Sequence, residues 1–251
     1  MRKTKLVITM GPALMEGDRL RKVLLEADAI RINASHGDPD ARLQTLEFVR
    51  KTIAEGTRPV PIFLDLQGPK WRVGRIEEPL LLEVGSEGWF HAPGTEARPG
   101  TWAVPLPHPE LFEGARPGQQ WLLDDGALKL EITEVLADLL KSRVLVGGLL
   151  KARKGIHPLG IDLNMDPLTE KDHQDIAWGV KHDVDLFAQS FVRKASDVQI
   201  LQAMIKAQGG SQPIIAKIEH PQALANLQEI LDVSWGVMVA RGDLGVELGV
   251  E

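Results

Sequence analysis

The sequence predicts an α/β protein: a parallel (β/α) barrel of the TIM type that is incomplete and carries an inserted small antiparallel β domain. In residues 1–69 and 158–251, short apolar runs alternate with segments of helical apolar spacing, the pattern of β–α–β units in a parallel sheet. The stretch 70–157 between them has hardly any helical period and is rich in Gly, Pro and Trp. A complete barrel takes roughly 31 residues per unit, so the two flanking parts hold about six of the eight units.

The first barrel part, 1–69, is expected to contain three strands and two helices. Apolar runs at 6–10, 29–33 and 60–66 predict buried strands. Between them, the segments 18–26 and 38–53 place apolar side chains at helical spacing and predict helices. This order calls for a parallel sheet with right-handed crossovers.

The insert, 70–157, is expected to form a small β domain of its own. Alternating runs at 120–123, 128–135 and 143–146 fit antiparallel strands. Glycine and proline between such runs mark turns rather than helices.

The second barrel part, 158–251, resumes the alternation. Thr169 with Asp172 in the first turn fits a capping box and predicts a helix that ends at about residue 180. Further strands are expected at 183–191, 214–219 and 236–240, with helices at 195–207 and 220–231. A barrel short of two strands exposes two unpaired edges. We therefore expect a fragment, one partner of a split protein, or a chain that closes its barrel by association.

The composition excludes several classes of protein. The net charge is −6, and no basic run is interleaved with aromatic residues, so we expect no nucleic-acid partner. There are no cysteines, which excludes disulfides and thiolate metal sites. The apolar run near the N-terminus is too short for a signal peptide, and no run approaches the roughly 18 apolar residues of a membrane span. The expectation is a cytoplasmic protein without a membrane partner.

Charged residues follow two neighbouring strands near the end of the chain. Lys217 and Glu219 are two apart, so they share a face of a strand, and Asp243 follows the next strand. A parallel barrel builds its active site at the carboxyl ends of its strands. Two carboxylates suit a hard divalent cation, so the sequence predicts that Glu219 and Asp243 hold Mg²⁺ (or Mn²⁺) beside Lys217.

Several motifs stand in one order along almost the whole chain: TKLVITMGPA, RINASHG, LDLQGPKWR, LLDDGALKL, LTEKDHQDI, IIAKIEH and MVARGDLGVE. In this order they resemble pyruvate kinase. The resemblance implies that family's barrel with its inserted lid domain. It also implies the family's glycolytic reaction, phosphoryl transfer from phosphoenolpyruvate to ADP, which gives pyruvate and ATP.

The resemblance also implies roles for individual residues. Arg31 and Lys217 are implied to be catalytic: Arg31 binds the phosphate as a forked donor, and Lys217 stabilises the charge of the transferring group. Asp243 is implied to contact the substrate as well as the metal. Three further residues are implied to bind the substrate through a turn whose backbone N–H groups face it: Ala240, Arg241 and Gly242. The glycine permits a close approach of the backbone to the substrate. The nucleotide contacts map onto Asn33, Ala34, Ser35, His36, Arg72 and Lys154.

The family's monovalent cation site maps onto Asn33, Ser35, Asp65 and Leu66. Lys70 stands where potassium-dependent members of the family carry Glu. A fixed ammonium can supply the positive charge that K⁺ otherwise supplies, so K⁺ is expected not to be required.

The resemblance ends after the sixth strand. The family's seventh and eighth strands carry a threonine that helps to protonate the enolate, and many members have a regulatory domain beyond them; the sequence has no counterpart to either. Since proton transfer is worth roughly 10²–10⁴-fold, we expect weak or no turnover from the chain alone. A homo-oligomer or a complementing chain is the expected means of closing the barrel.

Two other functions remain open at this point. The first is a Mg²⁺-dependent aldolase that uses the enolate of pyruvate on the same barrel, with the same Glu219 and Asp243. The lid insert and the Lys154 region argue against it, because an aldolase has no nucleotide to cover. The second is a non-catalytic paralogue of pyruvate kinase that binds a partner chain through the open barrel edge.

Activity is expected to be independent of K⁺, because the Lys70 ammonium supplies the charge. The measurement compares turnover of phosphoenolpyruvate and ADP in KCl and in NaCl at the same ionic strength. A clear stimulation by KCl over NaCl contradicts this expectation.

Overall fold

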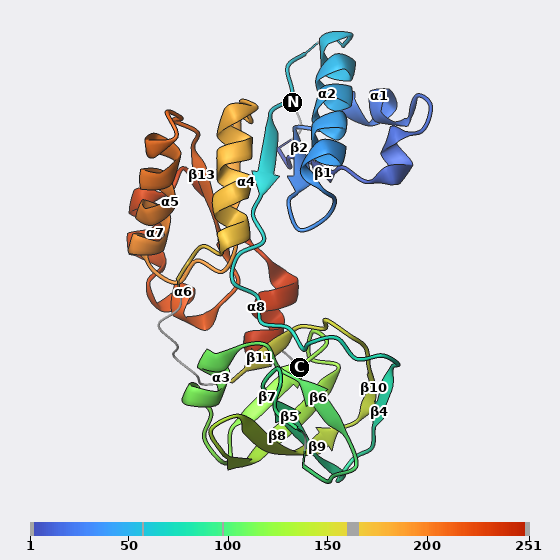
Figure 1. Cartoon of the computed structure of the whole chain (residues 1–251). Coiled ribbons are helices and arrows are strands. Elements are labelled where there is room, and N and C mark those ends of the chain that lie inside the picture. Colours follow the sequence, from blue (N-terminus) through green and yellow to red (C-terminus); the bar gives the residue numbers. More distant parts are fainter. Residues whose placement is uncertain (1–2, 57, 97, 160–165, 249–251) are drawn as a thin grey trace. The chain divides into compact units, whose positions relative to one another are not determined.

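The computed structural model describes residues 3–56, 58–96, 98–159 and 166–248 (Figure 1). The chain divides into two compact units. One, which we call the barrel unit, comprises Met1–Pro69 and Asp166–Ala240, and the other, the insert unit, comprises Lys70–Met165 and Arg241–Glu251. Within the described ranges, every helix is too short or too polar to cross a membrane.

The barrel unit is built on a six-stranded sheet whose spatial order follows the chain, β1-β2-β3-β12-β13-β14. Every neighbouring pair is parallel. A parallel sheet in which each strand is added beside the last is part of a (β/α) barrel, and the predicted fold class is confirmed. The strands are β1 (Val7–Thr9), β2 (Ala29–Asn33), β3 (Ile62–Asp65), β12 (Leu186–Gln189), β13 (Ile214–Ile218) and β14 (Gly236–Val239).

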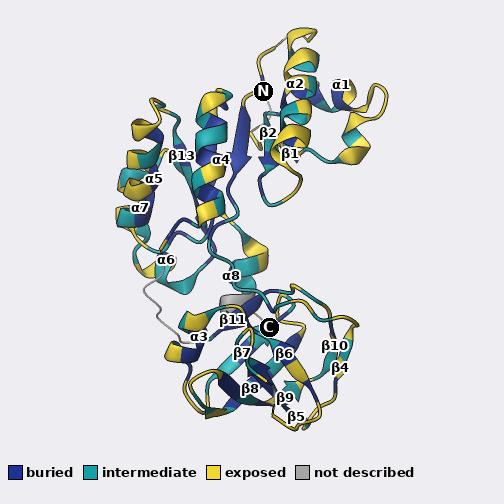
Figure 2. Ribbon diagram, in the orientation of Figure 1, coloured by how far each residue is buried: buried dark blue, intermediate teal, exposed yellow. Residues whose placement is uncertain are grey.

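The middle of this sheet is its core. Every residue of β3 and β12 is buried, as expected of strands covered on both faces. Figure 2 shows exposed residues on the helices and loops that surround the strands. At the two ends of the sheet, Val7 of β1 and Val239 of β14 are 48% and 58% exposed. Among the described residues, β1 and β14 each pair with a single neighbour, so both edges of the sheet are open.

Helices connect the strands, and capping residues at the N-termini of two helices are visible in the sequence. Asp38 accepts a hydrogen bond from the Ala41 N–H at the start of α2, and Thr169 and Asp172 form the predicted capping box of α4. The helices of the barrel unit are η1 (Pro12–Met15, a 3-10 turn), α1 (Arg19–Leu24), α2 (Pro39–Ala54), α4 (Glu170–Lys181), α5 (Ala195–Ala207), α6 (Pro221–Ala225) and α7 (Leu227–Val233).

The segment predicted to be helical, 220–231, is helical in the structure, but it is divided into two helices, α6 and α7. The break lies at Asn226, whose φ of −105° and ψ of 18° are not helical. Its side-chain amide donates to the Arg193 carbonyl at 3.0 Å. An Asn side chain bound to a carbonyl outside its own helix stabilises a turn rather than a continuous helix.

The insert unit contains a six-stranded sheet, β11-β7-β8-β9-β5-β6, and a two-stranded ribbon, β10-β4. Its pairs are antiparallel except β5–β6. Phe90, Trp102 and Trp121 pack at its centre, with ring centroids 5.6 and 5.7 Å apart. The strands are β4 (Leu80–Leu82), β5 (Glu87–His91), β6 (Ala103–Pro105), β7 (Gln120–Leu123), β8 (Leu128–Val135), β9 (Leu139–Val146), β10 (Gly148–Leu150) and β11 (Ile156–Pro158).

Three features of the insert unit differ from the sequence prediction. Strand β9 begins at Leu139, four residues before the predicted start at 143. A short helix, α3 (Pro109–Gly114), interrupts the strands, with a proline in its first turn. The helix α8 (Arg241–Leu248) follows β14 in the chain but groups with the insert unit.

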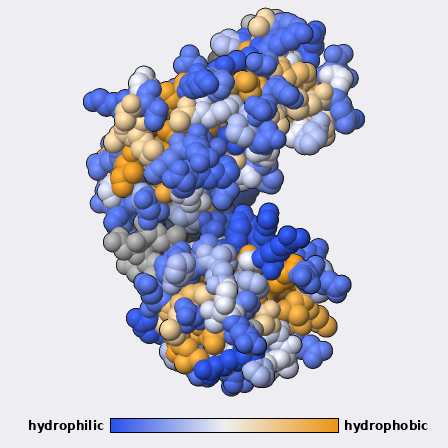
Figure 3. All heavy atoms as spheres, in the orientation of Figure 1, coloured by the Kyte–Doolittle hydropathy of each residue, from blue (hydrophilic) through white to orange (hydrophobic). Residues whose placement is uncertain are grey.

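The ribbon of β4 and β10 carries an apolar surface. Leu81 and Leu149 are directly opposite in the register and are 61% and 49% exposed. Figure 3 shows hydrophobic side chains gathered over this ribbon. Leu82 and Leu150 of the same ribbon are buried in the core of the insert unit, so the ribbon packs one face on the core and exposes the other.

Replacing Gly179 of α4 by alanine is expected to destabilise the protein. A Cβ at this position would lie 2.7 Å from the ring of Phe187 in β12. Overpacking costs about 1–3 kcal/mol, and the preference of a helix for Ala over Gly, about 1 kcal/mol, offsets only part of it. Urea unfolding measures the difference. The control is Gly236→Ala, where a Cβ meets nothing within 4 Å; equal stability of the two variants contradicts the account.

Candidate active site

Four charged side chains from three strands of the barrel unit meet at the carboxyl end of its sheet. They are Arg31 in β2, Asp65 at the end of β3, and Lys217 and Glu219 in and just after β13, with Ser190 following β12. The carboxyl end of a parallel barrel is where active sites of this architecture lie.

Asp65 is the buried centre of this group, with a side chain only 2% exposed. Nε of Arg31 donates to its Oδ2 atom at 2.6 Å, and Nη2 of Arg31 forms an ion pair with the same oxygen at 2.5 Å. Its other oxygen, Oδ1, lies 3.3 Å from Nζ of Lys217. One carboxylate therefore holds two cations that come from different strands.

Lys217 has two further partners. Its ammonium lies 3.0 Å from Oε1 of Glu219, as sharing a face of the strand requires, and donates to the Ser190 hydroxyl at 2.7 Å. The same hydroxyl donates to the carbonyl of Leu66 at 2.7 Å. The ammonium is thus fixed in position by two carboxylates and a hydroxyl.

Glu219 is fixed by the backbone after β12. Its Oε2 atom accepts a hydrogen bond from the Phe191 N–H at 2.8 Å, and the residue is 2% exposed. Phe191 has a φ of 55°, in the left-handed region that a non-glycine residue seldom adopts. Strain of this kind persists where the surroundings enforce it and is concentrated at functional sites.

The sequence prediction missed Ser190 and Phe191, and it assigned Asp65 only to the cation site. A serine directly after a buried strand is the one local signal for Ser190. Gly68, with a φ of 67°, makes room for this segment, because a Cβ there would lie 2.9 Å from Cβ of Ser190.

The four charges balance as two cations and two carboxylates. Burying an unpaired charge is costly, so each member of the group depends on the others. An anionic ligand that approaches Arg31 and Lys217 would share these two cations with Asp65. The arrangement is therefore suited to binding an anion with forked and point-charge donors.

The predicted nucleotide residues Asn33 and His36 line a cavity of about 650 Å³ in the barrel unit. Its walls are largely apolar and include Met10, Pro12 and Met15. A cavity of this size, with an apolar lining and a few polar groups, is typical of small-molecule sites.

Residues of the same segment also form hydrogen bonds within the barrel unit. Asn33 Oδ1 accepts from the Ser35 N–H at 3.0 Å. The side chain of Ala34 is fully buried, and its carbonyl accepts from Arg42 and Lys171 at 3.2 and 2.6 Å. Of the predicted nucleotide residues in this segment, Asn33 and His36 are therefore the ones that line the cavity.

The residues of the predicted monovalent cation site lie together in the barrel unit. Asn33 and Asp65 are opposite in the register of β2 and β3, and the Leu66 carbonyl already accepts from Ser190. Lys70 belongs to the insert unit. That it replaces K⁺ at this site stays a prediction.

Asp243 lies in the first turn of α8, in the insert unit. Its carboxylate accepts from the Lys70 ammonium at 2.8 Å, and the same ammonium lies 3.3 Å from Asp125. Burial disfavours the charged form of Lys70, but hydrogen bonding to Asp243 and the charges of Asp243 and Asp125 outweigh it, so the pKa of Lys70 lies above its ordinary value. That Asp243 joins Glu219 around one metal ion stays a prediction.

The remaining predicted residues of the insert unit also have partners. Lys154 pairs with Asp124 at 2.6 Å, and Arg72 donates to the Arg153 carbonyl at 3.0 Å. Arg241 is exposed at the start of α8, and a Cβ on Gly242 would meet nothing within 4 Å. Contacts of these residues, and of Ala240, with a substrate stay predictions.

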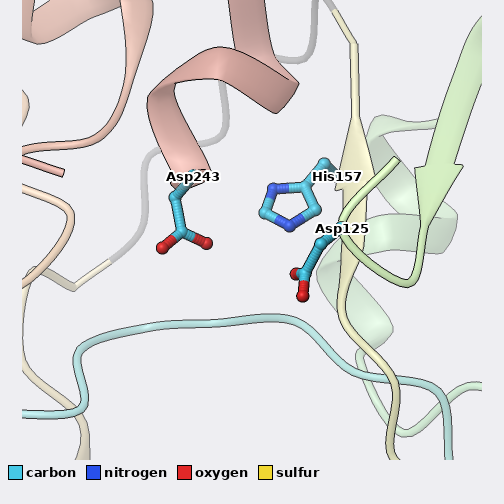
Figure 4. A group of neighbouring side chains, drawn as sticks. All are labelled: Asp125, His157 and Asp243. Carbon is cyan, nitrogen blue, oxygen red and sulfur yellow. The ribbon is translucent and has the colours of Figure 1, made fainter. Parts of the chain in front are cut away.

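A group of possible metal ligands lies in the insert unit. Asp125, His157 and Asp243 each offer one ligand atom, and these atoms lie within 4.8 Å of one another. Figure 4 shows the imidazole ring and the two carboxylates around a common space.

Comparison with known proteins gives one consistent result. The model of the barrel domain of pyruvate kinase matches residues 1–251. Pyruvate kinases of Agrobacterium vitis and Methylorubrum extorquens are each 40% identical to the chain. Each match covers the full length of the chain and 52% of the length of the relative. Pyruvate kinase of Geobacillus stearothermophilus is 38% identical over 43% of its length. The chain spans about half the length of the curated relatives it matches.

Replacing Asp65 by asparagine is expected to destabilise the barrel unit by about 3 kcal/mol or more, because Arg31 and Lys217 lose their shared buried carboxylate. Urea unfolding measures the loss. The control is Glu55→Gln, which breaks the exposed pair with Arg21 at 2.5 Å and is expected to cost less than about 1 kcal/mol. If both variants lose the same stability, Asp65 is not the buried centre of the group.

Proposed function

The chain belongs to the pyruvate kinase family, and from this premise we propose that it provides the phosphoenolpyruvate-binding part of a Mg²⁺-dependent phosphotransferase. The reaction moves the phosphoryl group of phosphoenolpyruvate to ADP and leaves the enolate of pyruvate, which then takes up a proton. The observation that carries the proposal is the group of Arg31, Asp65, Lys217 and Glu219, which meets at the carboxyl end of the parallel sheet.

Arg31 and Lys217 are assigned to the phosphate. Phosphoryl transfer depends mostly on positioning and on neutralising charge. Lys217 is fixed by Ser190 and Glu219, so its ammonium needs no reorganisation when negative charge develops on the transferring group. The planar guanidinium of Arg31 also donates a hydrogen bond to the Thr9 hydroxyl at 3.1 Å, which helps to fix its position. Asp65 positions both cations without contacting the substrate.

Glu219 and Asp243 are the residues that would hold Mg²⁺, which when bound neutralises charge on the phosphate and the enolate oxygen. Two carboxylates form a suitable set of oxygen ligands for this ion. The position of Glu219 supports this assignment, because a hydrogen bond from the Phe191 N–H fixes its carboxylate at the end of β13. Asp243 is assigned as the second Mg²⁺ ligand on the basis of the family resemblance.

The nucleotide is assigned to the cavity beside Asn33 and His36. Its apolar walls suit the face of a base, and its polar groups suit the sugar and phosphates. Arg72 and Lys154 of the insert unit are assigned to the phosphates of ADP. The cavity favours the kinase over the aldolase, because an aldolase has no nucleotide to place there.

Full activity is proposed to require further polypeptide. Strands β1 and β14 present exposed valines at the two open edges of the sheet. A homo-oligomer or a complementing chain that covers these edges closes the barrel. Turnover of the chain alone, followed by coupling pyruvate formation to lactate formation, is therefore expected to be low.

Replacing Lys217 by methionine is expected to weaken phosphoenolpyruvate binding in the presence of Mg²⁺ by about tenfold or more. A hydrogen bond to a charged group is worth about 1.5–3 kcal/mol, and 1.4 kcal/mol corresponds to a factor of ten. Isothermal titration calorimetry measures the affinity, and the coupled assay measures any residual turnover, which is expected to disappear. The matched control is Lys206→Met, an exposed lysine of α5.

The proposal is rejected if Lys217→Met and Lys206→Met bind phosphoenolpyruvate equally well. It is also rejected if the wild-type chain binds neither phosphoenolpyruvate nor ADP at millimolar concentrations while remaining folded.

A further inference from the structure

The ammonium of Lys70 lies between two carboxylates of the insert unit. It is 2.8 Å from Asp243 and 3.3 Å from Asp125, and the side chain is 16% exposed. A lysine enclosed in this way neutralises one of two neighbouring negative charges. The pair of carboxylates therefore keeps an excess of negative charge even with Lys70 in place.

The backbone of the insert unit fixes the positions of these groups. Asp125 lies in the turn between β7 and β8 and has a φ of 53°, next to Asp124 with a φ of 51°. The Asp124 N–H donates to the Gly155 carbonyl at 3.1 Å, and His157 is opposite Leu122 in the register of β11 and β7. The turn and β11 are thus held together by backbone hydrogen bonds.

The absence of a side chain at Gly155 leaves room for the side chain of Lys70. A Cβ at residue 155 would lie 2.9 Å from Cε of Lys70 and 3.5 Å from Nε2 of His157. The lysine stem therefore runs through space that any other residue at 155 would fill, and both the lysine stem and the imidazole of His157 lie next to Gly155.

The donor set around the ammonium is that of a divalent metal site. The ligand atoms of Asp125, His157 and Asp243 lie within 4.8 Å of one another. Two atoms bound to one ion at about 2.2 Å each lie at most about 4.4 Å apart, so small side-chain movements suffice. His157 is only 3% exposed, and Figure 4 shows its ring beside the two carboxylates.

We propose that Asp125, His157 and Asp243 form a divalent metal site of their own, and that the Lys70 ammonium and the metal ion exclude each other from it. The imidazole selects a transition-metal ion such as Mn²⁺ or Zn²⁺ over Mg²⁺, which prefers oxygen ligands. A doubly charged ion neutralises both carboxylates, whereas the ammonium neutralises one. The entry of the ion requires the lysine stem to swing away from Gly155.

The site deepens the proposed function in one respect, because Asp243 is the residue assigned there to Mg²⁺. An ion held by Asp125 and His157 competes for the carboxylate of Asp243. A transition-metal ion at this site is therefore inhibitory, and Lys70 protects Asp243 from it.

The test measures Mn²⁺ binding to the whole chain by electron paramagnetic resonance, without nucleotide or phosphoenolpyruvate. Lys70→Met is expected to raise the affinity for Mn²⁺ by about tenfold, the scale of effects from groups next to metal ligands. Adding Asp125→Asn to Lys70→Met is expected to abolish this gain. Asn tolerates the left-handed φ of residue 125, and the side chain is 67% exposed, so the turn is preserved.

A second measurement identifies the nitrogen ligand. Pulsed electron paramagnetic resonance of Mn²⁺-loaded Lys70→Met is expected to show coupling to an imidazole nitrogen, and adding His157→Gln is expected to remove it. Repeating the titration with Glu219→Gln present separates the two metal sites, because the gain from Lys70→Met is expected to persist without Glu219.

The proposal is overturned if Lys70→Met binds Mn²⁺ no more tightly than the wild-type chain, if the gain survives Asp125→Asn, or if no nitrogen coupling is seen. These outcomes are independent of the effect of Lys217→Met on phosphoenolpyruvate binding. Failure of the metal site and failure of the proposed function are therefore distinguishable.

Discussion

The buried contacts of Asp65 with Arg31 and Lys217 are the constraint on which the barrel unit depends. Charges that are buried must be paired, and here one carboxylate pairs with cations from two other strands. The sheet must therefore hold β2, β3 and β13 in one register at their carboxyl ends. A cluster of this kind contributes little net stability, yet it is expensive to disrupt, which is expected where charge is retained for binding.

The segment after β12 connects this network to the backbone. Ser190 bridges Lys217 and the Leu66 carbonyl, and the Phe191 N–H fixes Glu219. The left-handed φ of Phe191 and the close packing of Gly68 on Ser190 are local costs. In return, the lysine and the glutamate are oriented before any ligand arrives, and the proposed phosphoryl transfer would depend on such pre-organised charge.

Local signals in the sequence predicted most of the fold. Apolar periodicity located the six parallel strands, and the Thr169 capping box located the start of α4. The break of the helix at Asn226 was not predictable in this way, because its cause is a contact with Arg193, 33 residues away. The partners of the site residues were missed for the same reason: Asp65 meets Lys217, and Lys70 meets Asp243, across separations that only the folded chain brings together.

The central claim is that Arg31 and Lys217 are held by Asp65 in readiness for a phosphate. A crystal structure of the chain with phosphoenolpyruvate and Mg²⁺ tests it most directly. We expect a phosphate oxygen within hydrogen-bond distance of both Nζ of Lys217 and the Arg31 guanidinium, with Asp65 still in contact with Arg31. A phosphate bound elsewhere on the chain, with these two side chains contacting only Asp65, Ser190 and Glu219, contradicts the account.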